Sequence, residues 1–249
     1  MSNITKAEKT ELEAYEASLL SQQAQKFPAK YNAVKLSYDD DKPELMGKFI
    51  AIKEGETEWQ NLGESFKGII LAKRHQYSWY DKVDKEKFMR TAQFSEWAEP
   101  VKVSYEGLKD TVSGIAGWIK ERYGKESPKK AVYKAILYVL IGDTVHLLRV
   151  GGTSCVSWFK YNEAMDPRSM PFSVVTEFGR EKAKNPMGKT YYPMTFKAGE
   201  KTDPAIYNDL LRKSLEVSKM IAALENDNPN STVEDAAGIT PEDLPFDAK

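Results

Sequence analysis

KAVYKAILYVLIGDTVHLLRV, residues 130–150, is the stretch that decides the fold class of this chain. Its first part, residues 130–141, is rich in Val, Ile, Leu and Tyr, which favour β-strands. Gly142 and Asp143 are typical of a tight turn, and residues 144–150 return as a second strand. The stretch therefore predicts a β-hairpin.

Segments on both sides of this hairpin add further strands and helices. Short apolar runs predict strands at 49–52, at 66–72 continuing through 73–80, within 87–105, at 172–178 and at 191–196. Apolar residues at helical spacing predict helices at 3–25, 108–123 and 204–225, with a short helix at 154–161. About seven strands with helices around them fit a small barrel better than a parallel sheet. We therefore predict a β-rich α+β fold: an OB-fold-like closed β-barrel with peripheral helices.

Charge is distributed unevenly along the chain. The net charge is −1, yet residues 225–249 hold seven acidic residues and one lysine, which leaves −6 on the tail and +5 on the rest. We divide the chain into an N-terminal helix (1–30), a barrel domain ending in a helix (31–225) and an acidic, disordered tail (226–249). A basic body with an acidic tail is typical of proteins that bind polyanions, although an acidic tail also serves solubility alone.

The sequence argues against several classes of protein. No apolar run approaches the roughly 18 residues of a membrane-spanning helix, and the polar start of the chain is unlike a secretion signal. The single cysteine, Cys155, favours a reducing compartment. His75 and His146 with one cysteine are too few for the usual zinc sites, and no nucleotide-binding loop or hydrolase motif occurs. We therefore expect a cytoplasmic protein with no enzymatic activity, cofactor, metal or membrane contact.

The segment most informative about function is KRHQYSWY, residues 73–80, which interleaves cations with aromatic rings. Single-stranded nucleic acid is bound by cations that neutralise phosphates and by rings that stack on bases, each stacked base being worth about 1–3 kcal/mol. The candidate contacts in and after this segment are Lys73, Arg74, Tyr77, Trp79, Tyr80, Lys82 and Arg90. Packing in the core is an equally good explanation of the three rings.

A second basic segment lies between the last two predicted strands. Arg180, Lys182, Lys184 and Lys189 surround a turn at residues 186–188. We expect this loop to reach over a groove and contact phosphates. A solvated hairpin loop is the alternative.

The acidic tail ends with a short motif. Asp243-Leu244-Pro245-Phe246 resembles the acidic tip of bacterial single-stranded DNA-binding proteins, and many phage counterparts also end in acids and a Phe. The resemblance implies that Asp243, Leu244, Pro245 and Phe246 dock on replication and repair proteins, and that the tail competes with DNA for the basic body. The family's Phe is usually terminal, whereas Asp247-Ala248-Lys249 follow Phe246 here.

Together these features predict a protein of the phage or mobile-element type that binds single-stranded DNA with little sequence preference during replication, recombination or repair. Its expected partners are single-stranded DNA and, through the tail, replication or recombination proteins. The predicted helices at 3–25 and 204–225 are candidate surfaces for homo-oligomers, and packing on the barrel is the alternative. The alternatives are a phage factor that binds a host protein, an RNA-binding protein and a metal-dependent nuclease.

Overall fold

The computed structural model describes residues 31–39, 41–80, 88–95, 101–105, 108–112 and 132–227. The predicted N-terminal helix, nearly all of the acidic tail and the later part of the predicted helix at 108–123 lie outside these residues. Residues Leu108–Val112 form a strand, so the helix prediction is wrong there. Each of them pairs with a residue of Val101–Tyr105, and this pairing overrides their helical spacing.

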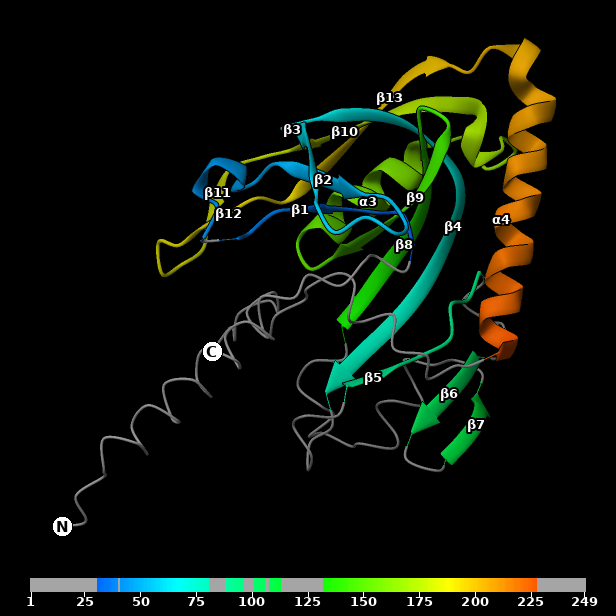
Figure 1. The fold of residues 1–249 in the computed structure, drawn as a ribbon, viewed down its shortest axis with the longest axis horizontal. Helices are drawn as coiled ribbons and strands as arrows, with labels where there is room; N and C mark the ends of the chain where they lie inside the picture. The colour runs from blue at the N-terminus through cyan, green and yellow to red at the C-terminus, as the bar shows by residue number, and fades with distance from the viewer. Residues whose placement is uncertain are drawn as a thin grey trace, which may run out of the picture.

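Nine strands form one main sheet (Figure 1). They are β1 (Ala33–Leu36), β2 (Phe49–Ile52), β3 (Gln60–Gly63), β4 (Phe66–Tyr80), β5 (Phe88–Arg90), β8 (Val132–Ile141), β9 (Thr144–Gly151), β10 (Val174–Arg180) and β13 (Met194–Lys201). Their order in space is β13-β10-β4-β8-β9-β1-β2-β3, and β5 pairs with β4. The β1–β9 pair is parallel and the other ladders of this sheet are antiparallel.

Two small hairpins and two helices accompany the main sheet. The hairpins are β6 (Val101–Tyr105) with β7 (Leu108–Val112), and β11 (Ala183–Lys184) with β12 (Thr190–Tyr191). The helices are α3 (Ser154–Ala164) and α4 (Tyr207–Asp227), and short 3-10 turns lie at Pro43–Leu45, Pro171–Ser173 and Pro204–Ile206. The hairpin predicted from residues 130–150 is confirmed, because β8 and β9 pair from Ile141 and Thr144 outward and Gly142 has the positive φ of 58° that suits the turn.

The main sheet curls around α3, whose buried side chains form the centre of an inner core (Figure 1). Trp158 and Tyr161 of α3 belong to this core together with Phe178 of β10. Phe66, at the start of β4, stacks on Phe178 with ring centroids 4.6 Å apart and meets Phe49 of β2 at 4.9 Å. Phe66 and Phe178 are partners on the adjacent strands β4 and β10, whereas the contact with Phe49 joins β4 to β2, which lies four strands away in the sheet order. The contact between Phe49 and Phe66 therefore closes the curl across the inner core.

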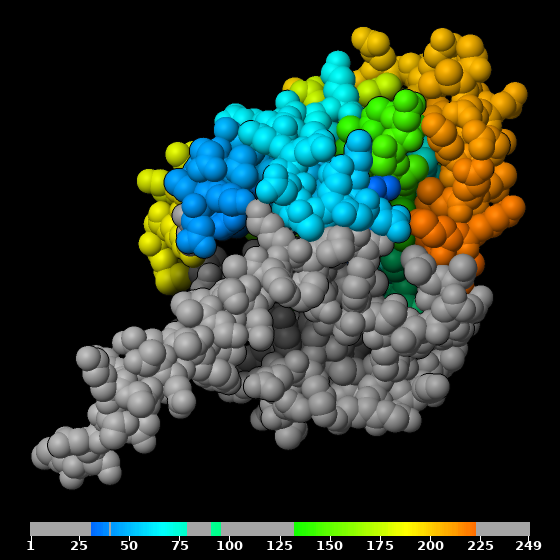
Figure 2. Space-filling model, in the orientation of Figure 1, coloured from blue at the N-terminus to red at the C-terminus, as the bar shows by residue number. Residues whose placement is uncertain are grey.

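Helix α4 packs on the opposite face of β4 and β8, where it forms an outer core (Figures 1 and 2). Leu210 and Val217 of α4 are buried with Leu71 and Tyr138 of the sheet. The Ser214 hydroxyl also donates a 2.8 Å hydrogen bond to the carbonyl oxygen of Leu71. The helix is therefore attached by its apolar face and by one hydrogen bond to β4.

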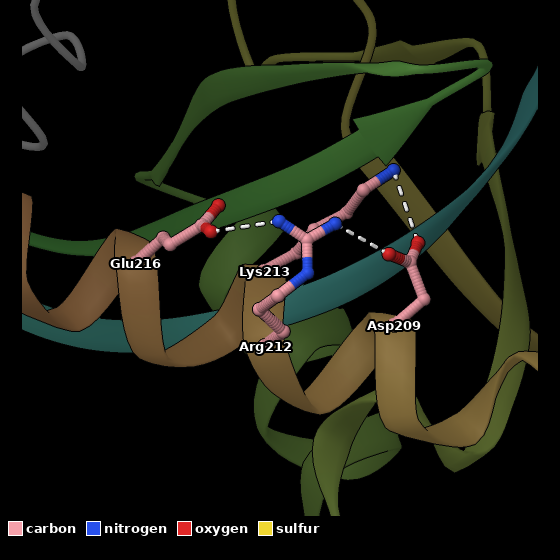
Figure 3. A network of polar contacts seen from close by, with 4 residues as sticks. All are labelled: Asp209, Arg212, Lys213 and Glu216. Atoms are coloured by element: carbon pink, nitrogen blue, oxygen red, sulfur yellow. Dashed lines mark hydrogen bonds and ion pairs between the residues drawn. The ribbon is translucent and has the colours of Figure 1, made fainter.

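The solvent-facing side of α4 carries a polar network (Figure 3). Arg212 pairs with Asp209 at 2.6 Å and with Glu216 at 2.9 Å, and Lys213 lies 3.4 Å from Asp209. Exposed ion pairs at this helical spacing contribute little to stability. The network therefore marks the outward face of α4, while the buried apolar residues hold the helix in place.

The sheet is a half-barrel with two helices, so the prediction of a β-rich α+β fold is confirmed and the prediction of a closed barrel is wrong. Of the two described helices only α4 is peripheral, because α3 lies inside the curl. A closed barrel would need hydrogen bonds between β3 and β13, the two ends of the strand order, and among the described strands no ladder joins them. The free edge of β9 is taken by β1, with Ala33 opposite Leu147. The meander β1–β2–β3 therefore extends the sheet from β9. No helix in the described part of the chain is long and apolar enough to cross a bilayer.

Replacing Phe178 by Ala tests the inner core. The side chain is fully buried, so Phe178→Ala leaves a cavity and lowers the free energy of unfolding by about 3–5 kcal/mol in urea titrations. Leu215→Ala on α4 is the control, because Leu215 is 55% exposed and its truncation changes stability by less than about 0.5 kcal/mol. Equal effects of the two substitutions would contradict the inner core described above.

Candidate nucleic-acid interface

The predicted contact residues of β4 divide between the two faces of the sheet. Lys73 faces α3, where its Nζ donates a 2.7 Å hydrogen bond to Oδ1 of Asn162. Arg74 pairs across the sheet with Ile136, which belongs to the outer core under α4. Because neighbouring strand residues point to opposite faces, Arg74 cannot share one face with Lys73 and Tyr77.

Tyr77 belongs to a cluster of rings on the α3 face, beyond the inner core. This ring cluster consists of His75, Tyr77, Phe94, Tyr133 and Phe159. Tyr133 is at its centre, with ring centroids 5.8 Å from Tyr77 and 5.4 Å from Phe159, the latter nearly parallel at 22°. The hydroxyl of Tyr133 is hydrogen-bonded to Nδ1 of His75 at 2.7 Å.

The rings of the cluster differ in their contact with solvent. Phe94 is buried and Phe159 is 37% exposed, while Tyr77 and Tyr133 are half-buried. Burial raises the pKa of Tyr77, and it raises the pKa of Tyr133 further, with additional contributions from Cys155 and Tyr77. Both phenols are therefore neutral at physiological pH and offer no negative charge that would repel phosphate.

The remaining predicted contacts near β4 are only partly described. Trp79 and Tyr80 are the last residues of β4 and pair with Met89 and Phe88 of β5, and Arg90 pairs with Ser78. The side chains of Trp79, Tyr80 and Arg90, and the whole of Lys82, lie outside the described part of the structure. Their contact with nucleic acid stays a prediction.

Arg180, the first cation of the second basic segment, has a structural environment. Its guanidinium forms an ion pair with Glu64 and lies 4.4 Å from the ring centre of Tyr192. Its side chain is only 13% exposed. Tyr192 is itself fixed by Tyr38, whose hydroxyl donates a 2.8 Å hydrogen bond to the Tyr192 carbonyl. Arg180 therefore anchors the base of the β11–β12 hairpin, and a phosphate contact by this residue stays a prediction.

The three lysines of this hairpin are exposed. Lys182, Lys184 and Lys189 lie around a tight turn in which the Lys189 amide donates to the Asn185 side chain at 2.8 Å. Met187 at the tip is 72% exposed. The hairpin lies on the side of the molecule away from α4 (Figure 1). Its geometry is that of an ordered, cationic surface loop.

Several candidate residues were missed by the sequence analysis. Tyr133 and Phe159 join the ring cluster from β8 and α3, segments whose apolar patterns indicate core. On the outer face, Arg149 pairs across the sheet with Ile136, which is also the partner of Arg74, so two cations flank the same outer-core residue. Only the pairing register shows these neighbours, because nothing in the local sequence specifies which strands lie side by side.

Comparisons with known proteins add no relative to this description. No family model, no curated protein and no solved structure matches the chain. The tail motif, Asp243 to Phe246, lies outside the described residues. In the described part of the chain, no group of three or more His, Cys, Asp or Glu side chains is arranged to hold a metal ion.

Cys155 provides a chemical test of the packing beneath the ring cluster. The thiol is buried, its Sγ lies 3.5 Å from the Val150 carbonyl oxygen, and burial raises its pKa to about 11. We expect iodoacetamide to label the folded protein at pH 8 much more slowly than the urea-unfolded protein, because the reactive thiolate is scarce and inaccessible. A Val156→Cys variant is the control, since Val156 is 59% exposed and its replacement should label rapidly. Rapid labelling of native Cys155 would contradict the packing.

Proposed function

We propose that this protein binds single-stranded DNA with little sequence preference, without catalysing a reaction, in replication, recombination or repair. The observation that carries the proposal is the ring cluster, because it lies on the same face of β4 as Lys73. Rings beside a cation are the combination that holds unpaired strands, since rings stack on bases and cations neutralise phosphates.

The strand connectivity supports the same proposal. In an OB-fold, a five-stranded Greek-key barrel, the first strand pairs with the second and the fourth, a helix joins the third to the fourth, and the fifth flanks the fourth. The chain order β4, β8, β9, α3, β10, β13 and the ladders among these strands match that arrangement. The departure is β1, which occupies the edge of β9. We propose that the half-barrel is an OB-fold extended by the β1–β2–β3 meander.

This assignment also accounts for the two basic segments. The loops after the first and fourth strands of an OB-fold border its oligonucleotide-binding face. The corresponding connections here are residues 81–131, which contain Lys82 and Arg90, and residues 181–193, which contain three exposed lysines. In the proposal, Tyr77, Tyr133 and Phe159 stack on bases, while Lys73 and the hairpin lysines contact phosphate.

The tail completes the proposal from sequence alone. Residues 225–249 have a net charge of −6, which is close in size to the +5 of residues 1–224. We propose that the tail competes with DNA for the basic body and that Asp243 to Phe246 bind replication or recombination proteins in the host cytoplasm.

The first test compares two neighbouring cations on opposite faces. Wild-type protein should bind oligo-dT with an affinity that falls as salt rises, because binding releases counterions. Lys73→Ala should reduce the slope of log affinity against log salt by about one, and Arg74→Ala should leave it nearly unchanged. The measurement is fluorescence anisotropy at several salt concentrations, with oligo-U alongside to compare RNA. Absence of salt-sensitive binding by wild-type protein would refute the function.

The second test removes the exposed ring. Phe159→Ala should weaken oligo-dT binding by about 1–3 kcal/mol, because one stacking surface is lost while the fold is retained. Leu215→Ala on the far side of the sheet removes a similarly exposed apolar side chain and should leave the affinity unchanged. If both variants bind as tightly as wild type, the ring cluster is not the stacking platform.

A further inference from the structure

A cavity of about 300 Å³ lies between the inner face of β4 and the C-terminal half of α3. Its apolar wall includes Ile70 of β4, Trp158 of α3 and Met165 just after the helix. A volume of this size is at the lower end of the range for small-molecule sites, which suits a single small planar group.

The polar groups of the cavity are few and of mixed charge. The Lys73 ammonium and the Asn162 amide, joined by their 2.7 Å hydrogen bond, supply donors. Glu163 and Asp166 also line the cavity, and their side chains are acceptors, although one oxygen of Asp166 already accepts from the Arg168 amide at 2.9 Å. Two acidic side chains and one lysine give the cavity a net negative charge, which disfavours a phosphate group. A neutral ring that carries both an amino group and a carbonyl or ring nitrogen finds a hydrogen-bond partner for each.

The cavity continues from the ring cluster along the same two elements. On β4, the same-face residues Lys73, His75 and Tyr77 follow each other at about 6.6 Å, the repeat of alternate strand residues. On α3, Phe159 and Asn162 are three residues apart, so their side chains lie on adjacent turns of one side. Phe159 contacts the central ring Tyr133, and Asn162 contacts Lys73 at the cavity. The ring cluster and the cavity are therefore neighbours along both elements.

We propose that this cavity is a pocket for one unpaired nucleobase of the bound strand, and that it favours bases with an exocyclic amino group over thymine. The inference rests on the proposed function and adds a base preference at one position of the strand. The base enters between the apolar wall and the polar rim, and its amino group donates to a carboxylate. The Asn162 amide donates to the adjacent ring nitrogen, which accepts in cytosine but carries a hydrogen in thymine. The phosphates stay outside the cavity.

The test compares oligo-dC with oligo-dT, two pyrimidine strands of which only the first carries the amino group. Wild-type protein should bind oligo-dC about five- to tenfold more tightly, the value of one or two buried hydrogen bonds. Two variants should bring the ratio of the oligo-dC affinity to the oligo-dT affinity toward one. Asn162→Leu removes the amide donor, and Glu163→Gln removes the charge but keeps the shape. Glu216→Gln on the outward face of α4 is the matched control and should keep the wild-type ratio. Thermal unfolding followed by circular dichroism verifies that each variant is folded.

The outcomes separate the pocket from the general function. Binding of oligo-dT with no preference for oligo-dC, or a preference that both variants retain, overturns the pocket and leaves the proposed function standing. Failure of wild-type protein to bind either oligonucleotide overturns the proposed function, and the pocket with it. A ratio that falls in the two pocket variants alone supports both.

Discussion

The β-bulge at Leu71 decides which side chains of β4 can meet a ligand. Before it, Ile70 faces the inner core, and alternation alone would place Ala72 on the same face. The register shift between Ile70 and Ala72 inserts one residue, so Leu71 and Ala72 both pack in the outer core. Every residue of β4 after the bulge therefore points to the face opposite to the one that simple alternation predicts, and Lys73 and Tyr77 face α3. The Ser214 hydroxyl of α4 binds the Leu71 carbonyl, so the outer helix stabilises the bulge.

This constraint explains how far the sequence could predict the site. The hairpin at residues 130–150 follows from local propensity and a turn that needs Gly142, and both are properties of the segment itself. The bulge has no comparable local signal, and counting alternate residues from Phe66 would put Arg74, and not Lys73, beside the inner core. The partners of Tyr77 come from β8 and α3, so the ring cluster is a property of the tertiary packing. Closure of the barrel failed as a prediction for a similar reason, since nothing local specifies that β1 takes the edge of β9.

Charge in the sequence also does not reveal which cations have structural partners in the fold. Arg180 stood among the predicted contacts because of its neighbours Lys182, Lys184 and Lys189. Its ion pair with Glu64 and its stacking on Tyr192 instead give it the geometry of an anchor. Gly47 takes part in the same anchor, because a Cβ at this position would lie 2.7 Å from the Tyr192 ring. Arg180 therefore has a structural role at the base of the cationic hairpin that carries the three lysines, whereas its contact with phosphate stays a prediction.

Partial burial of Tyr77 and Tyr133 is compatible with a role in stacking. A fully exposed ring loses side-chain rotamer entropy when it binds a base, and this loss reduces the net affinity. In the ring cluster the conformations are already restricted by neighbouring rings and, for Tyr133, by the hydrogen bond to His75. Phe159 is the most exposed large apolar residue of the cluster, and it rests on Tyr133 at 5.4 Å. Core packing and stacking are therefore not exclusive alternatives here, because the buried part of the cluster orients the exposed ring that a base would meet.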